Sequence, residues 1–212
     1  MHVIVVGGGI GGLTLGLLLH ARGIGCEIYE AAPAMRELGV GINVLPHAIA
    51  ELAELGLLAR LDEVAVRTRE LIYTNRFGQE VWRELRGLDV GYEVPQLSIH
   101  RGRLHGVLYR AVIERLGRDA VHTGHRLTGF AQDGRVACAW FDGGRSAAGD
   151  AVIGCDGIHS AVRRQLYAGA RIDDVIGRAE REAIVNGYAR LAGFAPDQVN
   201  HVDRPARESR RV

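Results

Sequence analysis

The sequence has no lysine, so all 26 of its basic side chains are arginine. With 25 acidic residues the net charge is +1, which argues against the strong positive field of a protein that binds nucleic acid or an anionic membrane. Only 6% of the residues are aromatic, and every apolar run is too short to span a bilayer. The remaining composition, 47% hydrophobic and 24% charged, is that of an ordinary globular protein.

Cysteine is also scarce. Cys26, Cys138 and Cys155 form neither a CxxC pair nor any metal-ligand spacing. We therefore expect buried, inert thiols and no metal site. No charged segment precedes the apolar start of the chain, so we expect no secretory signal and a cytoplasmic location.

Glycine, by contrast, is abundant, with 29 residues, and the first of them define a motif. A β-branched run at 2–6 predicts a buried strand, the apolar segment 10–22 predicts a helix, and 26–30 predicts a second strand. Strand, glycine turn, helix and strand together make a βαβ unit.

The turn of this unit has the spacing Gly7-x-Gly9-x-x-Gly12. In such a turn the first glycine permits the sharp bend, the second lets the backbone approach a pyrophosphate, and the third lets helix and strand pack closely. Glu30 ends the second strand, where a carboxylate can accept hydrogen bonds from ribose hydroxyls. The pattern predicts a dinucleotide site, with a glycine turn that binds nothing as the alternative.

The rest of the chain alternates between helical and strand patterns. Apolar stripes predict helices at 46–58, 101–116, 160–167 and 171–191, the first of which should end near Gly56. Short apolar runs between turn signals predict strands at 70–74, 79–84, 95–100, 127–132, 135–141 and 151–155. Residues 31–43 have the composition of a loop, and 200–212 that of a frayed tail.

Three further segments resemble motifs of the class A FAD-dependent aromatic hydroxylases. Residues 36–43 (RELGVGIN) resemble the stretch that passes the isoalloxazine ring, and they are most similar to the phenazine-hydroxylase-like branch. Residues 98–104 resemble the helix start whose arginine, here Arg101, reaches the FAD phosphates and ribityl chain. Residues 154–163 (GCDGIHSAVR) resemble the Asp-Gly motif, whose aspartate lies near the FAD pyrophosphate and whose surroundings also serve NAD(P)H.

The resemblance covers residues 1–168 and implies a fold and a domain division. The fold class is α/β with a p-hydroxybenzoate-hydroxylase-like plan: a Rossmann-type FAD-binding domain, a three-stranded antiparallel meander and a partial substrate-domain sheet. The FAD-binding domain would comprise 1–63 and 101–168, the remnant of the substrate domain 64–100, and a C-terminal helix and tail 169–212.

The fingerprint and the resemblance together give the candidate cofactor residues, while no catalytic side chain is assigned. These residues are Gly7, Gly9, Gly12, Glu30, Arg36, Gly41, Arg101, Asp156 and Gly157. Arg101 would otherwise be a solvated helix start, but a cation there opposes the helix dipole unless an anion is bound. Asp156 has a bare turn residue as its alternative, and Arg36 a surface charge. We interpret His100, His105 and His159 as polar or capping residues rather than bases.

The chain also departs from the family. No segment matches the family's third motif, a Gly-Asp pair followed by Ala and Pro, or the strands that roof the substrate pocket. Residues 171–184 instead resemble the C-terminal helix of the same branch. We therefore expect an internal deletion after about residue 168, unpaired strand edges within 70–99, and a site open to water.

The expected function is an FAD-binding oxidoreductase of the NAD(P)H-dependent aromatic hydroxylase family, impaired by loss of the middle segment. Such enzymes take FAD as cofactor, NAD(P)H as reductant and a small aromatic substrate. The alternatives are a non-catalytic FAD- or nucleotide-binding remnant and a simple NAD(P)H-dependent reductase. Neither nucleic acid nor membrane is an expected partner, and the oligomeric state stays open.

Overall fold

The computed structural model describes residues 1–36 and 39–167. Met1–Gln165 form one compact unit, and a second unit is Leu166–Val212. The helix expected at 171–191, the tail and the expected deletion point lie outside the described residues.

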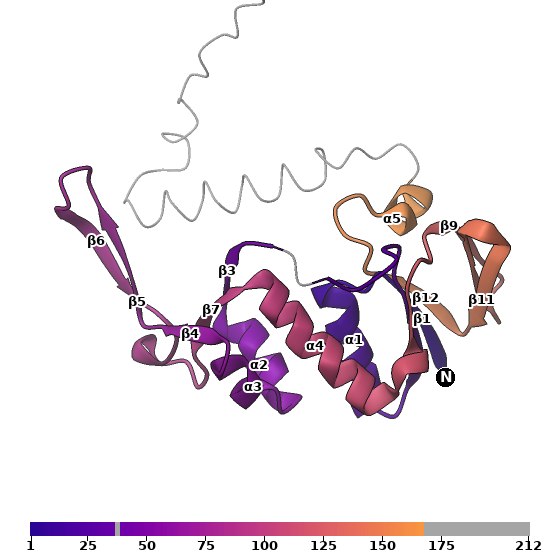
Figure 1. The fold of residues 1–212 in the computed structure, drawn as a ribbon, viewed down its shortest axis with the longest axis horizontal. Helices are drawn as coiled ribbons and strands as arrows, with labels where there is room; N and C mark the ends of the chain where they lie inside the picture. The colour runs from indigo at the N-terminus through magenta and orange to yellow at the C-terminus, as the bar shows by residue number, and fades with distance from the viewer. Residues whose placement is uncertain (37–38, 168–212) are drawn as a thin grey trace, which may run out of the picture. The chain divides into compact units, whose positions relative to one another are not determined.

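The first unit contains a parallel four-stranded sheet, of which Figure 1 labels β1 and β12. Its order is β12 (Ala151–Gly154), β1 (His2–Val6), β2 (Gly25–Tyr29) and β8 (Val121–His122). Helix α1 (Ile10–Ala21) connects β1 to β2, so the predicted βαβ unit is confirmed. The two-residue strand β8 was not predicted, because it is too short to show a pattern.

The two faces of this sheet are covered differently. Val3 and Val5 of β1 pack with α1 and with α4 (Arg101–Leu116). Ile4 and Val6 point to the opposite face, as the two-residue period of a strand requires, and pack with Leu127, Ala139 and Phe141. β1 is therefore buried on both sides, which explains its continuous apolar sequence.

The second layer is the expected antiparallel meander. It runs in the order β11 (Arg145–Gly149), β10 (Ala137–Phe141) and β9 (Leu127–Gln132). The short helix η3 (Asp142–Gly144) connects β10 to β11, while η2 (Arg118–Ala120) follows α4. The α/β fold with a three-stranded meander is thus confirmed.

A second antiparallel sheet has the order β3 (Gly41–Val44), β7 (Gln96–His100) and β4 (Ala65–Thr68). One of its faces packs on the core through Val44, Leu97 and Ile99. The expectation of a loop through residue 43 was wrong for 41–43, which are paired with β7.

The helix predicted at 46–58 is in fact two helices, α2 (Pro46–Glu54) and α3 (Leu58–Asp62). Gly56 lies between them with φ of +69°, a left-handed conformation that ends α2. The expected helix end near Gly56 is thus confirmed, whereas the second helix was not predicted because the apolar stripe continues across the break.

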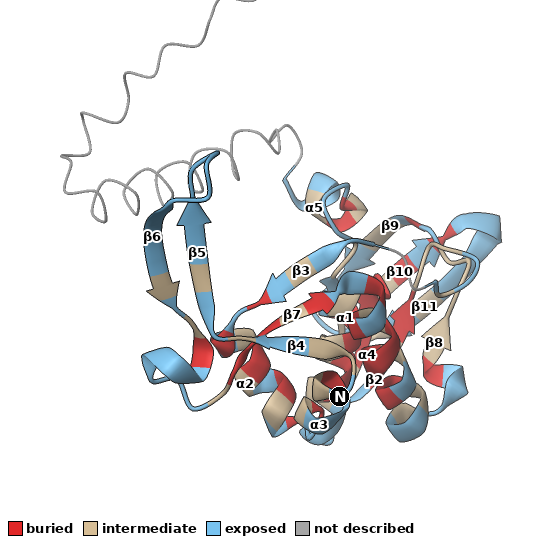
Figure 2. Cartoon of the chain, turned by 60° about the vertical axis from the view of Figure 1, so that its left-hand side comes forward, coloured by how far each residue is buried: buried red, intermediate tan, exposed pale blue. Residues whose placement is uncertain are grey.

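The predicted hairpin at 70–84 is present as β5 (Glu70–Thr74) and β6 (Glu80–Leu85), followed by the short helix η1 (Gly87–Val90). Asn75 Oδ1 accepts hydrogen bonds from the amides of Phe77 (2.9 Å) and Gln79 (3.1 Å) and so shapes its turn. Within residues 1–36 and 39–167 neither strand pairs with a third strand, and both are largely exposed (Figure 2). No helix in the described part of the chain is long and apolar enough to cross a membrane.

Candidate functional site

The glycine turn between β1 and α1 brings three glycines into three different environments. A Cβ on Gly7, whose φ is +110°, would overlap the carbonyl of Cys155, and a Cβ on Gly12 would overlap the carbonyl of Gly7. A Cβ on Gly9 would meet no atom within 4 Å. The fold itself therefore requires glycine at 7 and 12, whereas at 9 the chain leaves open space.

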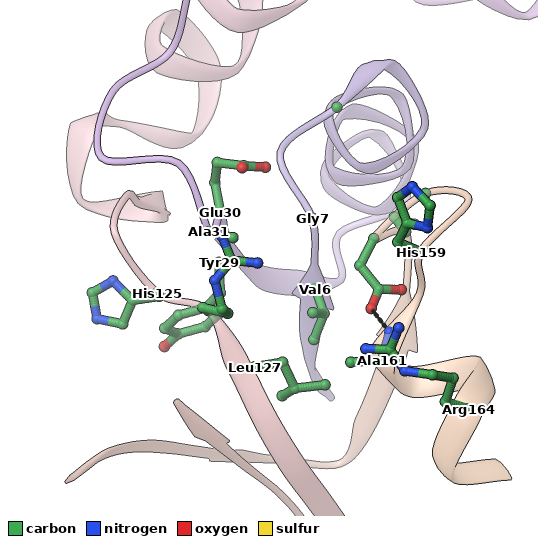
Figure 3. Close-up of a pocket in the computed structure, with 15 residues that line it drawn as sticks. Val6, Gly7, Tyr29, Glu30, Ala31, His125, Leu127, His159, Ala161 and Arg164 are labelled. Atoms are coloured by element: carbon green, nitrogen blue, oxygen red, sulfur yellow. Dashed lines mark hydrogen bonds between the residues drawn. The ribbon is translucent and has the colours of Figure 1, made fainter. Parts of the chain in front are cut away.

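That space belongs to a first hollow of about 340 Å³ at the carboxyl ends of β1, β2 and β12. It is lined by the glycine turn, by the end of β2, by the β8–β9 connection and by the segment leading into α5 (Ala161–Leu166). Glu30 lies to one side of Gly7, and His159 and Arg164 lie to the other (Figure 3). The carboxyl end of a parallel sheet is where α/β proteins bind ligands.

A second hollow of about 410 Å³ lies on the other side of the same turn. Its lining residues are Gly8, Gly9, Glu30, Ala32, Pro33, Ala34, Met35, Arg36, Arg101 and His105. Gly9 and Glu30 line both hollows. A long ligand that crosses the glycine turn would therefore occupy both.

Glu30 holds the turn in place. Its Oε2 accepts a hydrogen bond from the amide of Gly8 (2.6 Å), and its Oε1 accepts one from the amide of Ala32 (2.8 Å). The sequence predicted a ribose contact for this carboxylate but not these two bonds. Each carboxylate oxygen can accept more than one hydrogen bond, so a ribose contact stays compatible with this geometry.

Two histidines support the site, His105 within α4 and His100 at the end of β7. His105 Nε2 donates to the carbonyl of Gly8 (2.8 Å) and ties α4 to the glycine turn. His100 caps α4, since its Nδ1 accepts from the amide of Gly102 (3.2 Å) while its Nε2 donates to the carbonyl of Gly39 (2.9 Å). The interpretation of these histidines as polar or capping residues agrees with this geometry. His105 follows Arg101 by one helical turn, a spacing that could have placed it at the site.

Asp156 lies at the other end of the first hollow. Its Oδ2 accepts from the amides of Ala161 (2.6 Å) and Val162 (3.2 Å), the first residues of α5. Its Oδ1 is buried and has no hydrogen-bond partner among the described residues. Gly157, with φ of +75°, makes the turn that follows. A buried carboxylate oxygen without a donor indicates that a ligand or water supplies one.

Four arginines reach the two hollows. Arg36 and Arg101 line the second hollow, and Arg126 and Arg164 line the first. Within residues 1–36 and 39–167 none of their side chains forms an ion pair, in contrast to the surface pair of Arg67 and Asp62. Four unpaired cations around a turn with free amide groups favour an anionic ligand such as a pyrophosphate. Arg126 and Arg164 were not predicted from the sequence.

Tyr29, which lines the first hollow, belongs to a group of interacting polar and aromatic side chains behind it. Burial and a hydrogen bond to Glu27 raise the pKa of Tyr29, whose ring stacks on His122 and Phe141. Burial tends to raise the pKa of Glu27, but the hydrogen bond from Tyr29 (2.6 Å) and nearby His122 and His2 lower it overall. The tyrosine hydroxyl is thus fixed as a donor to a charged carboxylate.

Not every predicted residue lies at the two hollows. Gly41 lines a separate third hollow of about 340 Å³ on the sheet β3–β7–β4, and Gly12 contributes to packing. Of the three thiols only Cys26 is buried, whereas Cys138 and Cys155 are half-buried, so the expectation for those two was wrong. Burial raises the pKa of Cys155, which keeps this thiol protonated beside the first hollow. No cluster of side chains that could hold a metal ion is present among the described residues.

The chain is similar to known flavoproteins. A family model described as "FAD binding domain" matches residues 1–204. Phenazine 1,6-dicarboxylic acid hydroxylase PhzS of Lysobacter antibioticus is 45% identical over 202 residues, covering 89% of this chain and 50% of that protein. FAD-dependent urate hydroxylase of Klebsiella pneumoniae is 33% identical over 213 residues, covering 92% of this chain and 54% of that protein.

Solved structures agree with the sequence comparisons. The crystal structure of Klebsiella pneumoniae HpxO complexed with FAD and uric acid is 31% identical, with a TM-score of 0.66, and covers 78% of this chain and 41% of that one. The chain spans about half the length of the curated relatives it matches, 50% and 54% for the two above. The glycine turn, the two hollows and these similarities have a common explanation: the chain belongs to the FAD-binding domain family.

Proposed function

We propose that this chain binds FAD across the glycine turn and forms the cofactor-binding part of an NAD(P)H-dependent aromatic hydroxylase. The observation that carries the proposal is that Gly9 and Glu30 line both hollows, so that one extended dinucleotide fits over the turn. The open space at Gly9 and the unpartnered Oδ1 of Asp156 support the same fit.

Each end of the cofactor would have its own set of residues. Glu30 would accept ribose hydroxyls in the first hollow, while the free amides at the start of α1 would face the pyrophosphate. Arg36 and Arg101 would neutralise the phosphates from the second hollow. Asp156 Oδ1 would accept a hydrogen bond from a hydroxyl group or a water molecule, while its Oδ2 still accepts the hydrogen bonds from α5.

Bound FAD would supply the electron transfer between NAD(P)H and oxygen, and the protein would position and shield it. The substrate class we propose is a small aromatic ring, because the relatives named above are hydroxylases of phenazine dicarboxylic acid and of urate. For the pyrophosphate of NAD(P)H we propose Arg164, which lines the first hollow and forms no ion pair within the described residues.

Titration of the apoprotein with FAD tests the proposal. Glu30→Ala removes an acceptor whose bonds to ribose hydroxyls contribute roughly 1.5–3 kcal/mol each, so FAD affinity should fall by at least about tenfold. A yellow protein with fluorescence quenching at equimolar FAD is the expected wild-type result. A wild-type chain that fails to bind FAD would overturn the proposed function.

Glu30→Ala also removes the hydrogen bonds that Glu30 accepts from the amides of Gly8 and Ala32. A second variant is therefore needed to separate the loss of a ribose contact from the loosening of the turn. His105→Ala loosens the same turn by removing the bond to the Gly8 carbonyl, without touching the acidic group. If Glu30 contacts ribose, Glu30→Ala should weaken FAD much more than His105→Ala does. Equal losses would assign Glu30 to the turn alone.

A further inference from the structure

Strand β5 has a free edge. It packs chiefly against β6, and the hairpin projects from the other sheets of the first unit (Figure 1, Figure 2). The amide of Arg86 donates to the carbonyl of Arg69 (2.7 Å), so the backbone of Arg69 faces β6. Because the hydrogen-bonding direction alternates along an antiparallel strand, Glu70, Ile72 and Thr74 direct their amides and carbonyls away from β6. Among the described residues, no strand pairs with this edge.

The two edges of the hairpin differ in how they are protected. Strand β6 has a bulge at Val81, which has no partner on β5, and Arg83 lies on its outer edge. Bulges, basic side chains and prolines keep exposed strand edges from pairing with other chains. Strand β5, with the sequence ELIYT, has none of these three features. Its edge is therefore open to a further strand.

The sequence of β5 is complementary to itself in an antiparallel arrangement. A two-fold axis at Ile72 places this residue opposite the partner's Ile72. Glu70 then lies opposite the partner's Thr74, whose hydroxyl can donate to the carboxylate. Leu71 lies opposite the partner's Tyr73, an aliphatic side chain beside an aromatic one. Cross-strand pairs of these kinds stabilise a sheet, and no like charges meet along this seam.

The charges of the hairpin also favour the β5 edge over the β6 edge. The carboxylate of Glu70 is balanced within its own hairpin, because Arg83 forms an ion pair with it (2.5 Å). A two-fold pairing of β6 at the corresponding position would place Arg83 opposite the partner's Arg83. Like charges directly opposite each other destabilise a sheet.

Pairing through β5 would cover apolar surface that the single hairpin exposes. Ile72 is 38% exposed, and Tyr73 is 45% exposed although its ring stacks on Trp82. Ile72 and Tyr73 lie on opposite faces of the strand, so the partner's Ile72 would cover one face and the partner's Leu71 the other. An isolated two-stranded hairpin is marginally stable in water, and additional strands stabilise it.

We propose that the free edge of β5 is a dimerisation surface and that its partner is a second copy of this chain. The two hairpins form one antiparallel sheet in the order β6, β5, the partner's β5 and the partner's β6. The two-fold pairing closes at two copies, and the bulge and Arg83 on each outer β6 edge oppose further addition. The β5 edge lies outside the two hollows, so dimerisation does not depend on FAD binding.

Sedimentation of the 212-residue chain over a range of concentrations tests the proposal, and we expect an equilibrium between monomer and dimer. Ile72→Arg removes the central apolar pair and places two like charges across the axis. It should raise the Kd of the dimer at least about tenfold. Val81→Arg is the matched control, because Val81 is 69% exposed on the other strand. Its dimer Kd should stay within about twofold of the wild-type value.

A second variant reports the register without destabilising the hairpin. Cα atoms of opposite residues in a hydrogen-bonded antiparallel pair are about 5.5 Å apart, a distance that a disulfide can span. In a background that lacks the half-buried thiols of Cys138 and Cys155, Ile72→Cys should form a covalent dimer under mild oxidation. Val81→Cys should form one far more slowly. Thermal melts and FAD titration should show all variants folded.

Three results would overturn the dimerisation proposal. The first is an Ile72→Arg chain that stays folded and dimerises as tightly as the wild type. The second is an equal rate of cross-linking for Ile72→Cys and Val81→Cys. The third is a wild-type chain that stays monomeric at every concentration, and protection of the β5 amides from hydrogen exchange in that monomer would assign the edge to another part of the same chain. None of these results bears on FAD binding, which the titration measures separately.

Discussion

The glycines of the fingerprint turn show that one residue type can be required for unrelated reasons. Gly7 and Gly12 lie against backbone carbonyls, so the protein would have to shift to accept a side chain there. Gly9 faces open space that both hollows share. A requirement for glycine at 9 must come from the ligand, and that separation can be measured.

Gly9→Val should abolish FAD binding while the protein stays folded, because the side chain would stand between the backbone and the pyrophosphate. Gly12→Ala should instead lower the free energy of unfolding by several kcal/mol, because its Cβ meets the carbonyl of Gly7. Urea unfolding and FAD titration of both variants distinguish the two effects. Normal FAD content in Gly9→Val would show that the pyrophosphate lies elsewhere.

The bond between Tyr29 and Glu27 predicts a dependence of stability on pH. The pKa of Glu27 is lowered on folding from its ordinary value of 4.5, so its contribution is present above that pH and is lost as the pH falls through the lowered value. Tyr29→Phe removes the donor and should lower the free energy of unfolding at pH 7 by about 1 kcal/mol, since the half-exposed carboxylate is partly screened.

The difference between wild type and Tyr29→Phe should shrink below pH 4.5, where the wild-type carboxylate takes up its proton. Tyr73→Phe is the control, because Tyr73 is 45% exposed and its hydroxyl has no described partner. Thermal melts across this pH range provide the measurement. A Tyr29→Phe penalty that persists undiminished at acid pH would contradict the assignment to Glu27.

Among the secondary-structure elements, α5 depends on two side chains with different relations to the site. Ser160 Oγ caps the helix by accepting from the amide of Arg163 (2.9 Å), whereas Asp156 holds the amides of Ala161 and Val162 and lines the first hollow. The helix is only six residues long, so its order depends on these caps rather than on intrinsic propensity.

Ser160→Ala should destabilise α5 by about 1 kcal/mol and leave FAD affinity within about twofold, since a lost cap acts on the helix alone. Asp156→Ala should destabilise α5 to a similar extent and also weaken FAD, because the Oδ1 acceptor is lost. Amide hydrogen exchange of the helix and FAD titration separate the two. Equal FAD affinities for the two variants would show that Asp156 acts only as a cap.

Elements with a strong local pattern could be predicted from the sequence, and those defined by pairing could not. The βαβ unit and the hairpins at 70–84 and 127–141 carry periodicity and turn residues of their own. The strands β3, β4 and β8 span only two to four residues and exist because partners bind them. The same distinction holds for the residues of the site. Gly9 and Asp156 could be predicted because they belong to local motifs, whereas Arg126 and His105 reach the hollows only through the tertiary fold.

At the scale of the whole molecule, the possible chemistry depends on whether the chain can both bind the cofactor and shield it from water. The parallel sheet is covered on both faces, and the site lies at the carboxyl ends of its strands. The hairpin β5–β6, in contrast, exposes large apolar side chains, with Phe77 at 72%, Val81 at 69% and Trp82 at 42%. These side chains belong to the segment that resembles the substrate domain, and within the described residues no further strand adjoins them.

We therefore expect the 212-residue chain, loaded with FAD, to oxidise NAD(P)H slowly or not at all and to hydroxylate aromatic compounds poorly. Oxygen insertion needs a closed, dry site, and in a site open to water the electrons from NAD(P)H should appear as hydrogen peroxide. The measurement couples NAD(P)H consumption, peroxide yield and product mass over a panel of phenazines and phenolic acids, with free FAD as the background. Hydroxylated product in stoichiometric yield with little peroxide would contradict this expectation. It would show that these residues alone close the site and that the chain is a fully active hydroxylase.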